Sequence, residues 1–322
     1  MSAGDSILVV RLGAMGDIIH ALPAVASLRL SFPKHRITWV VARKWVELLE
    51  GNPQIDQVVA FERRGKGALY ESWRTIRAIQ PDVAIDFQGL IQSALVGRSS
   101  GPREFFGPHR SQARESLAAL FYTRQVKTTG PHRIEANLQL AAAAGATQLT
   151  DQAWIPAGKP EGDLPNGPFV FASPFAGWAS KQWPIENYGL LARELQAQGL
   201  PLVVNVPPGF REKLAALPEL HIHESGLPGL IDGTRRAAAI IGVDSGPMHL
   251  AAALGKPGVA IFGPTDPARN GPFHSKLVVL RDPQAVTSYK RVEEIDPNMR
   301  AISVNQVKEA LLHSIRSARV PA

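Results

Sequence analysis

The sequence predicts an α/β protein of two successive domains, each built on a parallel sheet flanked by helices. Three observations support this fold class. Short β-branched runs alternate with helical stretches along the chain, which is the βαβ pattern of doubly wound sheets. The alternation stops at a segment rich in proline and glycine and then starts again. The length of 322 residues exceeds what one hydrophobic core usually organises.

The first domain is predicted to span residues 1–157, with short runs of β-branched and apolar residues as its strands. These strands are expected at Ile7–Arg11, Ile37–Val41, Gln57–Ala60 and Val83–Phe87. Apolar residues at helical spacing predict a helix over Ile18–Ser31, which Pro23 either opens or bends. Later helical stretches are expected at Ser111–Tyr122 and in the alanine-rich Glu135–Gly145.

The second domain is predicted to span residues 158–303, and the boundary falls in the segment IPAGKPEGDLPNGP at 155–168. Its strands are expected at 169–172, 201–206, 239–243 and 258–262. Its helices are expected at 185–198, 211–217, 230–238 and 248–254. A last helix, within residues 304–322, could pack back onto the first domain. Two such halves predict ligand-binding loops at the carboxyl ends of the strands.

The composition indicates a globular protein with an anionic partner. The chain carries 35 Lys and Arg against 28 Asp and Glu, which favours a nucleic acid, a phosphorylated metabolite or an acidic membrane surface. No zinc-knuckle spacing, RNA-recognition aromatic motif or long basic run supports nucleic acid. The absence of cysteine excludes disulfides and thiol catalysis. Because no apolar run approaches the ~20 residues of a membrane span and no secretory signal is present, a cytoplasmic location is expected.

A loop with two glycines, Gly13 and Gly16, lies between the first strand and its helix. Backbone amides at such a helix start can face an anion or a polar ligand. The loop lacks the dinucleotide spacing G-x-G-x-x-G, which disfavours a nicotinamide cofactor. From position alone, Asp17 at the end of this loop is an N-cap rather than a catalytic base, and His20 is a packed histidine.

The second domain repeats this design with more polar residues. A strand ends at Asp244, a turn through Ser245 and Gly246 follows, and His249 is expected in the first turn of the next helix. Helix-start amides and the Ser245 hydroxyl could hold a diphosphate. The alternative is a tight turn with an Asp or Ser cap. The next strand also ends in a polar loop with Thr265 and Asp266, and two such loops at one sheet edge favour a ligand site.

Lys181 follows the first strand of the second domain, in the segment SKQWP. Its ammonium group could form a charge-assisted bond with a phosphate. Trp183 and Pro184 beside it are interpreted as packing and the start of a helix. The alternative for Lys181 is an ordinary solvated surface lysine.

Five segments together resemble glycosyltransferase family 9, and within it the type I heptosyltransferases of lipopolysaccharide synthesis. The segments are RLGAMGDIIHALPA, DFQGLIQSALV, RESLAALFYTR, SKQWP and DSGPMHLAAALGKPGVAIFGPTDP. The resemblance covers nearly the whole chain and implies a GT-B fold, meaning two facing Rossmann-like domains. It also implies inverting transfer, without metal or other cofactor, from ADP-L-glycero-D-manno-heptose to a Kdo residue of Kdo-lipid A.

The resemblance assigns roles to individual residues. Asp17 matches the catalytic base, and Lys181 matches the lysine that binds the donor phosphate. The donor side comprises Asp244, Ser245, Gly246, His249, Thr265, Asp266 and Glu212. Arg114 matches an arginine of the acceptor side. Together with Arg63, Arg64 and Lys66 it makes the first domain basic, which would help it to dock on Kdo-lipid A at the inner face of the inner membrane. A solubilising surface is the alternative for these basic residues.

The chain also departs from the family pattern. Gly13 and Ala14 stand where the type I enzymes carry hydroxyl residues, and the loop before Lys181 has a different spacing. Another nucleotide sugar or acceptor within the same family is therefore one alternative function. A non-catalytic protein that binds nucleotides or nucleic acid is the other, because fold does not fix function.

Overall fold

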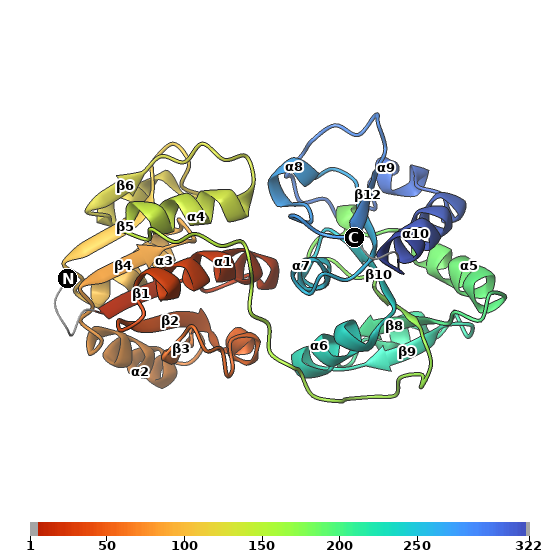
Figure 1. The fold of residues 1–322 in the computed structure, drawn as a ribbon, viewed down its shortest axis with the longest axis horizontal. Coiled ribbons are helices and arrows are strands. Elements are labelled where there is room, and N and C mark those ends of the chain that lie inside the picture. Colours follow the sequence, from red (N-terminus) through yellow and green to blue (C-terminus); the bar gives the residue numbers. More distant parts are fainter. Residues whose placement is uncertain (1–5, 320–322) are drawn as a thin grey trace. The chain divides into compact units, whose positions relative to one another are not determined.

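The computed structural model describes residues 6–319, which form two compact units that divide between Pro156 and Ala157. This division lies one residue from the boundary that the sequence predicts. Each unit contains a parallel sheet of six strands with helices on both faces (Figure 1). The predicted α/β class is thus confirmed.

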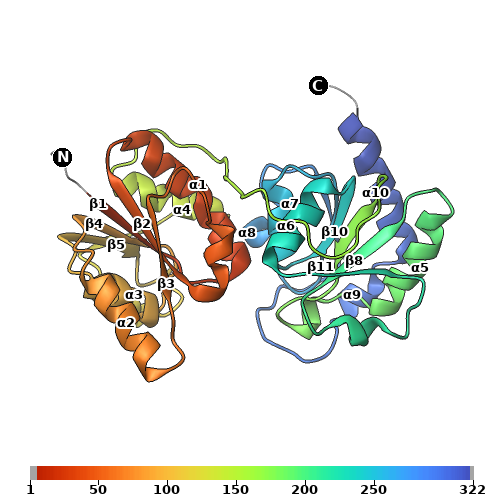
Figure 2. The same cartoon turned by 90° about the horizontal axis from the view of Figure 1, so that it is seen from below.

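The first unit begins with β1 (Ser6–Val10), and its sheet has the order β3-β2-β1-β4-β5-β6. Its other strands are β2 (Arg36–Ala42), β3 (Gln57–Phe61), β4 (Val83–Asp86), β5 (Glu104–Pro108) and β6 (Arg124–Val126). Its helices are α1 (Met15–Ser31), η1 (Arg43–Leu48), α2 (Lys66–Arg77), α3 (Ile91–Ser99), η2 (Ser116–Phe121) and α4 (Arg133–Ala143). Helices α1 and α4 cover one face of the sheet, and α2 and α3 cover the other (Figure 2).

The second unit has the sheet order β12-β11-β10-β7-β8-β9. Its strands are β7 (Val170–Ser173), β8 (Leu202–Val206), β9 (His221–Glu224), β10 (Ala239–Val243), β11 (Gly258–Phe262) and β12 (Leu277–Arg281). Its helices are η3 (Ala179–Lys181), α5 (Ile185–Gln196), η4 (Arg211–Leu214), α6 (Leu227–Arg236), α7 (Gly246–Ala253), α8 (Pro267–Asn270), α9 (Pro297–Ala301) and α10 (Val304–Arg319). Counted within each unit, both sheets follow the strand order 3-2-1-4-5-6 of dinucleotide-binding folds.

The last helix, α10, belongs to the second unit. Its side chains Val307 and Leu311 are fully buried in the core of that unit, and the helix packs against α5, β10, β11 and β12. The predicted second domain ends at residue 303 and leaves out this helix. In the structure, the described part of the helix completes the core of that domain.

Several predicted elements differ from the observed ones. The helix expected at 18–31 starts at Met15, and its buried Pro23 lies inside it. The helix expected at Ser111–Tyr122 is a loop that ends in the short η2. The helix expected at 211–217 is only the short η4. Strands β5, β6, β9 and β12 are additional to those predicted.

Gly258 starts β11 at a point where two backbones approach closely. It has a φ of +148°, and a Cβ at this position would lie 1.9 Å from the carbonyl oxygen of Ile240. The amide of Gly258 donates a hydrogen bond to the Ser314 hydroxyl of α10 at 2.8 Å. Only glycine fits here, since any other residue would collide with backbone atoms that cannot move aside.

No helix within residues 6–319 combines the length and the apolar character that crossing a bilayer requires.

Candidate functional site

The loop after β1 leads into α1 without a side-chain cap. The N-cap residue is Ala14, and Asp17 is the third residue of the helix, where its Oδ2 accepts a hydrogen bond from the Ala14 amide at 3.3 Å. The interpretation of Asp17 as an N-cap is therefore wrong by three positions. Asp17 is the N3 residue, and its side chain accepts from the N-cap amide as in a capping box. Gly13 lies against Trp45, because a Cβ on Gly13 would be 3.0 Å from the indole nitrogen.

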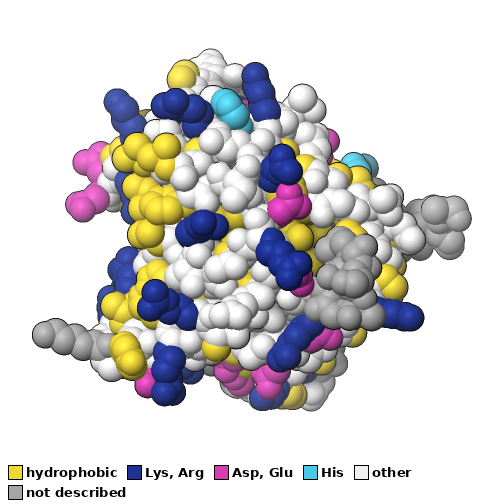
Figure 3. Space-filling model, turned by 90° about the vertical axis from the view of Figure 1, so that its left-hand side faces the viewer, with side chains coloured by type: hydrophobic (Ala, Val, Ile, Leu, Met, Phe, Trp, Pro, Cys, Tyr) yellow, Lys and Arg dark blue, Asp and Glu magenta, His cyan; other side chains and the backbone are white. Residues whose placement is uncertain are grey.

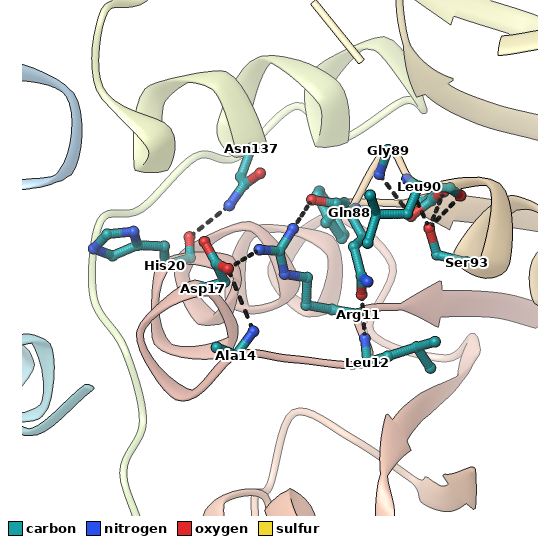
Figure 4. A network of polar contacts seen from close by, with 12 residues as sticks. Arg11, Leu12, Ala14, Asp17, His20, Gln88, Gly89, Leu90, Ser93 and Asn137 are labelled. Atoms are coloured by element: carbon teal, nitrogen blue, oxygen red, sulfur yellow. Dashed lines mark hydrogen bonds and ion pairs between the residues drawn. The ribbon is translucent and has the colours of Figure 1, made fainter. Parts of the chain in front are cut away.

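Asp17 forms an ion pair with Arg11, the residue that follows β1. The Arg11 Nη2 atom lies 2.6 Å from Asp17 Oδ2, and the two side chains are 8% and 31% exposed. The other guanidinium nitrogen, Nη1, donates to the carbonyl oxygen of Phe87 after β4. Figure 4 shows the Arg11 guanidinium group directed at the Asp17 carboxylate. Adjacent strand ends are therefore joined by one side chain.

The charge state of Asp17 follows from competing effects. Burial raises the pKa of Asp17, but the positive charges of Arg11, Arg133 and Arg114 and the Ala14 amide outweigh burial and lower it below its usual value. The carboxylate is thus ionised at neutral pH, as a general base must be before reaction.

A pocket surrounds this carboxylate at the carboxyl ends of β1 and β4. Its lining residues are Arg11, Asp17, His20, Phe87, Gln88, Arg114, Arg133 and Asn137. The structure therefore brings the predicted Asp17 and Arg114 together. It also adds Arg11 and Arg133, so three arginine side chains line the pocket around a single carboxylate. The pocket suits a ligand that carries both negative charge and a hydroxyl group.

The turn after β4 is built on a buried carboxyl group. The Oδ1 atom of Asp86 accepts from the amides of Gln88 and Gly89, and its Oδ2 accepts from the hydroxyls of Ser93 and Tyr122, at 2.7 to 3.3 Å. Burial raises the pKa of Asp86 above its usual value, although these bonds oppose the rise. This carboxyl group therefore holds the turn that presents Gln88 to the pocket.

Gly89 fixes the loop that carries Arg114. Its φ is +70°, and a Cβ there would lie 2.9 Å from Pro108 and 3.3 Å from the Arg114 amide. Its carbonyl oxygen accepts a hydrogen bond from the Glu115 amide at 2.9 Å. The side chain of Gln88 meanwhile accepts from the Leu12 amide at 2.8 Å (Figure 4). The loops after β1, β4 and β5 are thus tied together around the pocket.

The other predicted acceptor residues lie elsewhere in the first unit. Arg63 and Arg64 are exposed in the connection after β3, and Lys66 is the first residue of α2. The side chain of Lys66 lies outside the described part of the structure. Neither Arg63 nor Arg64 lines the pocket around Asp17.

In the second unit, Lys181, Asp244 and His249 form one charged cluster. The Lys181 Nζ atom lies 2.6 Å from Asp244 Oδ2, and His249 Nε2 lies 3.6 Å from Asp244 Oδ1. All three side chains are at most 16% exposed. Burial raises the pKa of Asp244, but the His249 hydrogen bond and the Lys181 charge outweigh it and lower the pKa well below the usual value. Lys181 is thus a partly buried, paired lysine, unlike an ordinary surface lysine.

Two hydroxyl groups lie beside this cluster at the ends of β10 and β11. Ser245 is the N-cap of α7, yet its hydroxyl makes no capping bond. The buried Ser245 Oγ and Thr265 Oγ1 atoms have no hydrogen-bond partner among residues 6–319. Gly246 is the first residue of α7, so its amide lies at a helix start that can receive an anion.

The remaining predicted donor residues have more ordinary surroundings. Asp266 caps the short α8 by accepting from the Ala268 amide at 2.9 Å. Glu212 is exposed in η4, between β8 and β9. Trp183 is buried, donates to the Ile302 carbonyl at 2.8 Å and packs on Tyr188, as its packing role predicts.

Four residues that line the Asp17 pocket have no predicted role in the site, namely Arg11, Gln88, Arg133 and Asn137. The position of Gln88 directly after a predicted strand, in the DFQGL segment, could have indicated a place in the site. His20 is buried, as the interpretation as a packed histidine predicts, and it also lines the pocket. Among residues 6–319, no group of three or more His, Asp or Glu side chains is arranged to hold a metal ion.

Comparisons with known proteins agree with this architecture. Residues 69–298 match the model of glycosyltransferase family 9 (heptosyltransferase). The lipopolysaccharide heptosyltransferase 1 of Pseudomonas aeruginosa is 30% identical over 309 residues, covering 85% of this chain and 83% of the relative.

Two solved structures of the Escherichia coli heptosyltransferase WaaC are similar in fold. The structure with ADP has a TM-score of 0.78 at 23% identity and covers 96% of this chain and 99% of WaaC. The structure with ADP-2-deoxy-2-fluoro heptose has a TM-score of 0.75 at 23% identity, with coverages of 94% and 98%. The predicted GT-B fold is confirmed, and this chain is a glycosyltransferase that belongs to glycosyltransferase family 9.

Proposed function

We propose that this protein transfers heptose from ADP-L-glycero-D-manno-heptose to a Kdo residue of Kdo-lipid A, with inversion, in lipopolysaccharide inner-core synthesis. The name of the Pseudomonas relative and the ligands in the two WaaC structures support this donor and this acceptor class. The observation that carries the proposal is the pocket in which an ionised Asp17 lies among arginine side chains. Such a site suits deprotonation of a hydroxyl on an anionic sugar.

In the proposed reaction Asp17 accepts the proton of the acceptor hydroxyl. The hydroxyl oxygen then forms a bond with the anomeric carbon of the heptose while the bond between that carbon and the phosphate oxygen breaks. ADP leaves from the opposite face with the bonding electrons. A single displacement of this kind inverts the anomeric centre and needs one base. General base catalysis typically contributes ~10²–10⁴-fold to the rate.

The second unit would bind the leaving diphosphate. Lys181 has three N–H donors, and the pair with Asp244 uses one of them, so a phosphate oxygen can bind without loss of that pair. The start of α7 and the Ser245 and Thr265 hydroxyls supply further donors. These groups would stabilise developing negative charge as a metal ion does elsewhere, and we therefore propose turnover without metal or cofactor.

The acceptor side would recognise negative charge. Arg114 and Arg133 line the pocket beside Asp17, and guanidinium groups bind carboxylates well. The carboxylate of a Kdo residue is such a group. Arg63, Arg64 and Lys66 lie outside this pocket, and we assign them to the phosphates of lipid A.

We also propose a cytoplasmic protein that binds peripherally to the inner face of the inner membrane. Figure 3 shows hydrophobic side chains beside many lysine and arginine side chains on one face of the molecule. On the layer of α2, α3 and η2, Tyr70, Leu117 and Leu120 are 67%, 59% and 78% exposed. Exposed apolar residues with cations around them suit an anionic lipid surface.

The decisive experiment is incubation with ADP-heptose and Kdo-lipid A, with and without EDTA. We expect equal ADP release in both, a product heavier by one heptose, and inverted anomeric configuration by NMR. Competition with other nucleotide sugars tests the donor. Binding of ADP without transfer to Kdo-lipid A would contradict the proposed function and favour a different acceptor or a non-catalytic protein. A strict and reversible magnesium requirement would contradict the metal-free part.

Membrane binding is tested separately by co-sedimentation with vesicles. We expect binding to vesicles that contain anionic lipid and much less to neutral ones. Replacement of Leu117 and Leu120 by Ser should weaken binding, while the solution assay with detergent-dispersed acceptor stays near normal. If that variant bound anionic vesicles as well as the unmodified protein does, the surface with Leu117 and Leu120 would not be the membrane-binding surface.

A further inference from the structure

Both contacts of the Asp17 carboxylate fall on the same oxygen. Arg11 Nη2 lies 2.6 Å from Oδ2, and the Ala14 amide donates to Oδ2 at 3.3 Å. Neither of these two contacts uses the other oxygen, Oδ1. The side chain is 31% exposed and lines the pocket, so one oxygen is anchored and the other is available to a ligand.

Arg11 is itself held firmly enough to act as an anchor. Its amide donates to the Val40 carbonyl at 3.2 Å, and its own carbonyl accepts from the Trp39 indole at 3.2 Å. Its guanidinium is buried and donates to the Phe87 carbonyl through Nη1. An arginine fixed at both ends presents Nη2 in one direction, which restricts the carboxylate that binds it.

We propose that Arg11 is a positioning residue that holds Asp17 through Oδ2 and leaves Oδ1 as the atom that takes the acceptor's proton. The inference rests on the proposed role of Asp17 as the base. A bidentate pair would occupy both oxygens, whereas this single contact orients the carboxylate without blocking it. Orientation has a large effect on rate, since a misplacement of about 1 Å can cost roughly 10²-fold.

The first unit offers a matched control in Arg29. Arg29 pairs with Asp56 and donates to the carbonyl oxygens of Pro33 and His35 at 3.1 and 2.8 Å, so it resembles Arg11 in its bonds. It does not line the pocket. Arg29→Met should therefore reproduce the loss of a structural ion pair without touching the base.

The first test measures the pKa of Asp17 directly and needs no acceptor. In the ¹³C NMR titration of the full chain, the Asp17 carboxyl signal is identified by its absence in Asp17→Asn. We expect Arg11→Met to raise the pKa of Asp17, because a neighbouring positive charge is lost, and Arg29→Met to leave it unchanged. An unchanged titration in Arg11→Met would overturn the proposed contact.

The second test is a double-mutant cycle on turnover of ADP-heptose and Kdo-lipid A. We expect Arg11→Met to lower kcat roughly 10- to 10²-fold with little change in the KM for donor. In the Asp17→Asn background the same change should have little further effect, because Arg11 acts through Asp17. Arg11→Lys should keep the low pKa but recover only part of kcat.

The outcomes separate the two proposals. Near-normal turnover by folded Asp17→Asn would remove Asp17 as the base and so overturn the proposed mechanism. If Asp17→Asn is inactive but Arg11→Met loses no more turnover than Arg29→Met, only the positioning role of Arg11 is overturned. Equal losses from Arg11→Met in both backgrounds would likewise exclude action through Asp17.

Discussion

The fourth strand of each sheet ends beside a buried aspartate, but the two carboxyl groups have different partners. Asp86 ends β4 and meets the Ser93 and Tyr122 hydroxyls and two amides. Asp244 follows β10 and meets Lys181 and His249. Burial raises the pKa of Asp86, whereas His249 and Lys181 overcome burial and lower the pKa of Asp244.

The topology and the hydrogen-bond partners contribute differently to the two carboxyl groups. The shared strand order places both carboxyl groups at the same point of a sheet, where they are removed from water. Neutral donors then make one of them a structural support for a turn. A lysine and a histidine make the other an ionised member of a charged cluster. Position buries the group, and its neighbours decide its chemistry.

The largest expected effect is from Asp86→Ala, which leaves two amides and the Tyr122 hydroxyl without their acceptor, while the Ser93 hydroxyl keeps the Leu90 carbonyl. We expect the free energy of unfolding to fall by about 3–5 kcal/mol, since each unsatisfied buried group costs about 1–3 kcal/mol. Chemical denaturation measures it. Asp86→Asn is the control: it keeps one oxygen for the amides, and the hydroxyls can turn to accept, so a loss within about 1 kcal/mol is expected. Equal losses in both variants would mean that Asp86 acts as a charge.

A smaller effect is expected from Lys181→Met, which leaves Asp244 with His249 as its partner. We expect the free energy of unfolding to fall by about 1–3 kcal/mol, less than for a fully broken buried pair. The affinity for ADP, measured by calorimetry, should fall about tenfold or more, which corresponds to about 1.4 kcal/mol. Unchanged affinity in a folded variant would return Lys181 to a purely structural role.

The two carboxyl groups should also respond to pH with opposite signs. The folded-state pKa of Asp244 lies below its usual 3.8, so its stabilising contribution is present above that pH and is lost as the pH falls. The folded-state pKa of Asp86 lies above its usual 3.8, so stability declines as the pH rises from there. Each pH unit in such a window corresponds to about 1.4 kcal/mol.

Unfolding measurements from pH 3 to pH 7 test this contrast against the Asn variants. Relative to Asp244→Asn, the unmodified protein should gain stability as the pH rises. Relative to Asp86→Asn, the unmodified protein should lose stability as the pH rises through the acidic range. Parallel curves for the two variants would show that both groups titrate alike and would remove the distinction.

The smallest effect is expected from Ser245→Ala. Because the Ser245 hydroxyl has no partner among the described residues, the free energy of unfolding should change by less than about 0.5 kcal/mol. ADP affinity should nevertheless fall if this hydroxyl binds phosphate. A marked loss of stability without a change in affinity would assign it to the structure of the turn, as Asp86 is.

The sequence predicts the strands that are mostly apolar, including β3 at a sheet edge, and it misses β5, β6, β9 and β12. β1, β4, β7 and β10 are continuous apolar runs because both of their faces are covered. β6 and β9, at the sheet edges, read RQV and HIHE and lack that signal. β12 reads LVVLR, and its β-branched residues could have predicted it.

Pairing across the sheet explains the rest of what the sequence missed. Arg11 could be placed at a strand end, but its bond to Phe87 depends on β1 and β4 being neighbours, which no local pattern specifies. The segment 111–122 has helical spacing, yet the bond from the Glu115 amide to Gly89 binds it as a loop. The roles of the site residues are properties of such long-range contacts.

The close approach at Gly258 also affects how mutational data on this family should be interpreted. In a saturation scan every substitution at Gly258 should abolish expression, because its Cβ would overlap the Ile240 carbonyl. That intolerance would equal or exceed that of Asp17, although Gly258 touches neither charged cluster. It stands within the longest segment of family resemblance, so part of the intolerance expected in that segment would reflect backbone geometry. A ranking of residues by tolerance to substitution alone would therefore place Gly258, which is required for packing, above Asp17, which is proposed to act in the reaction.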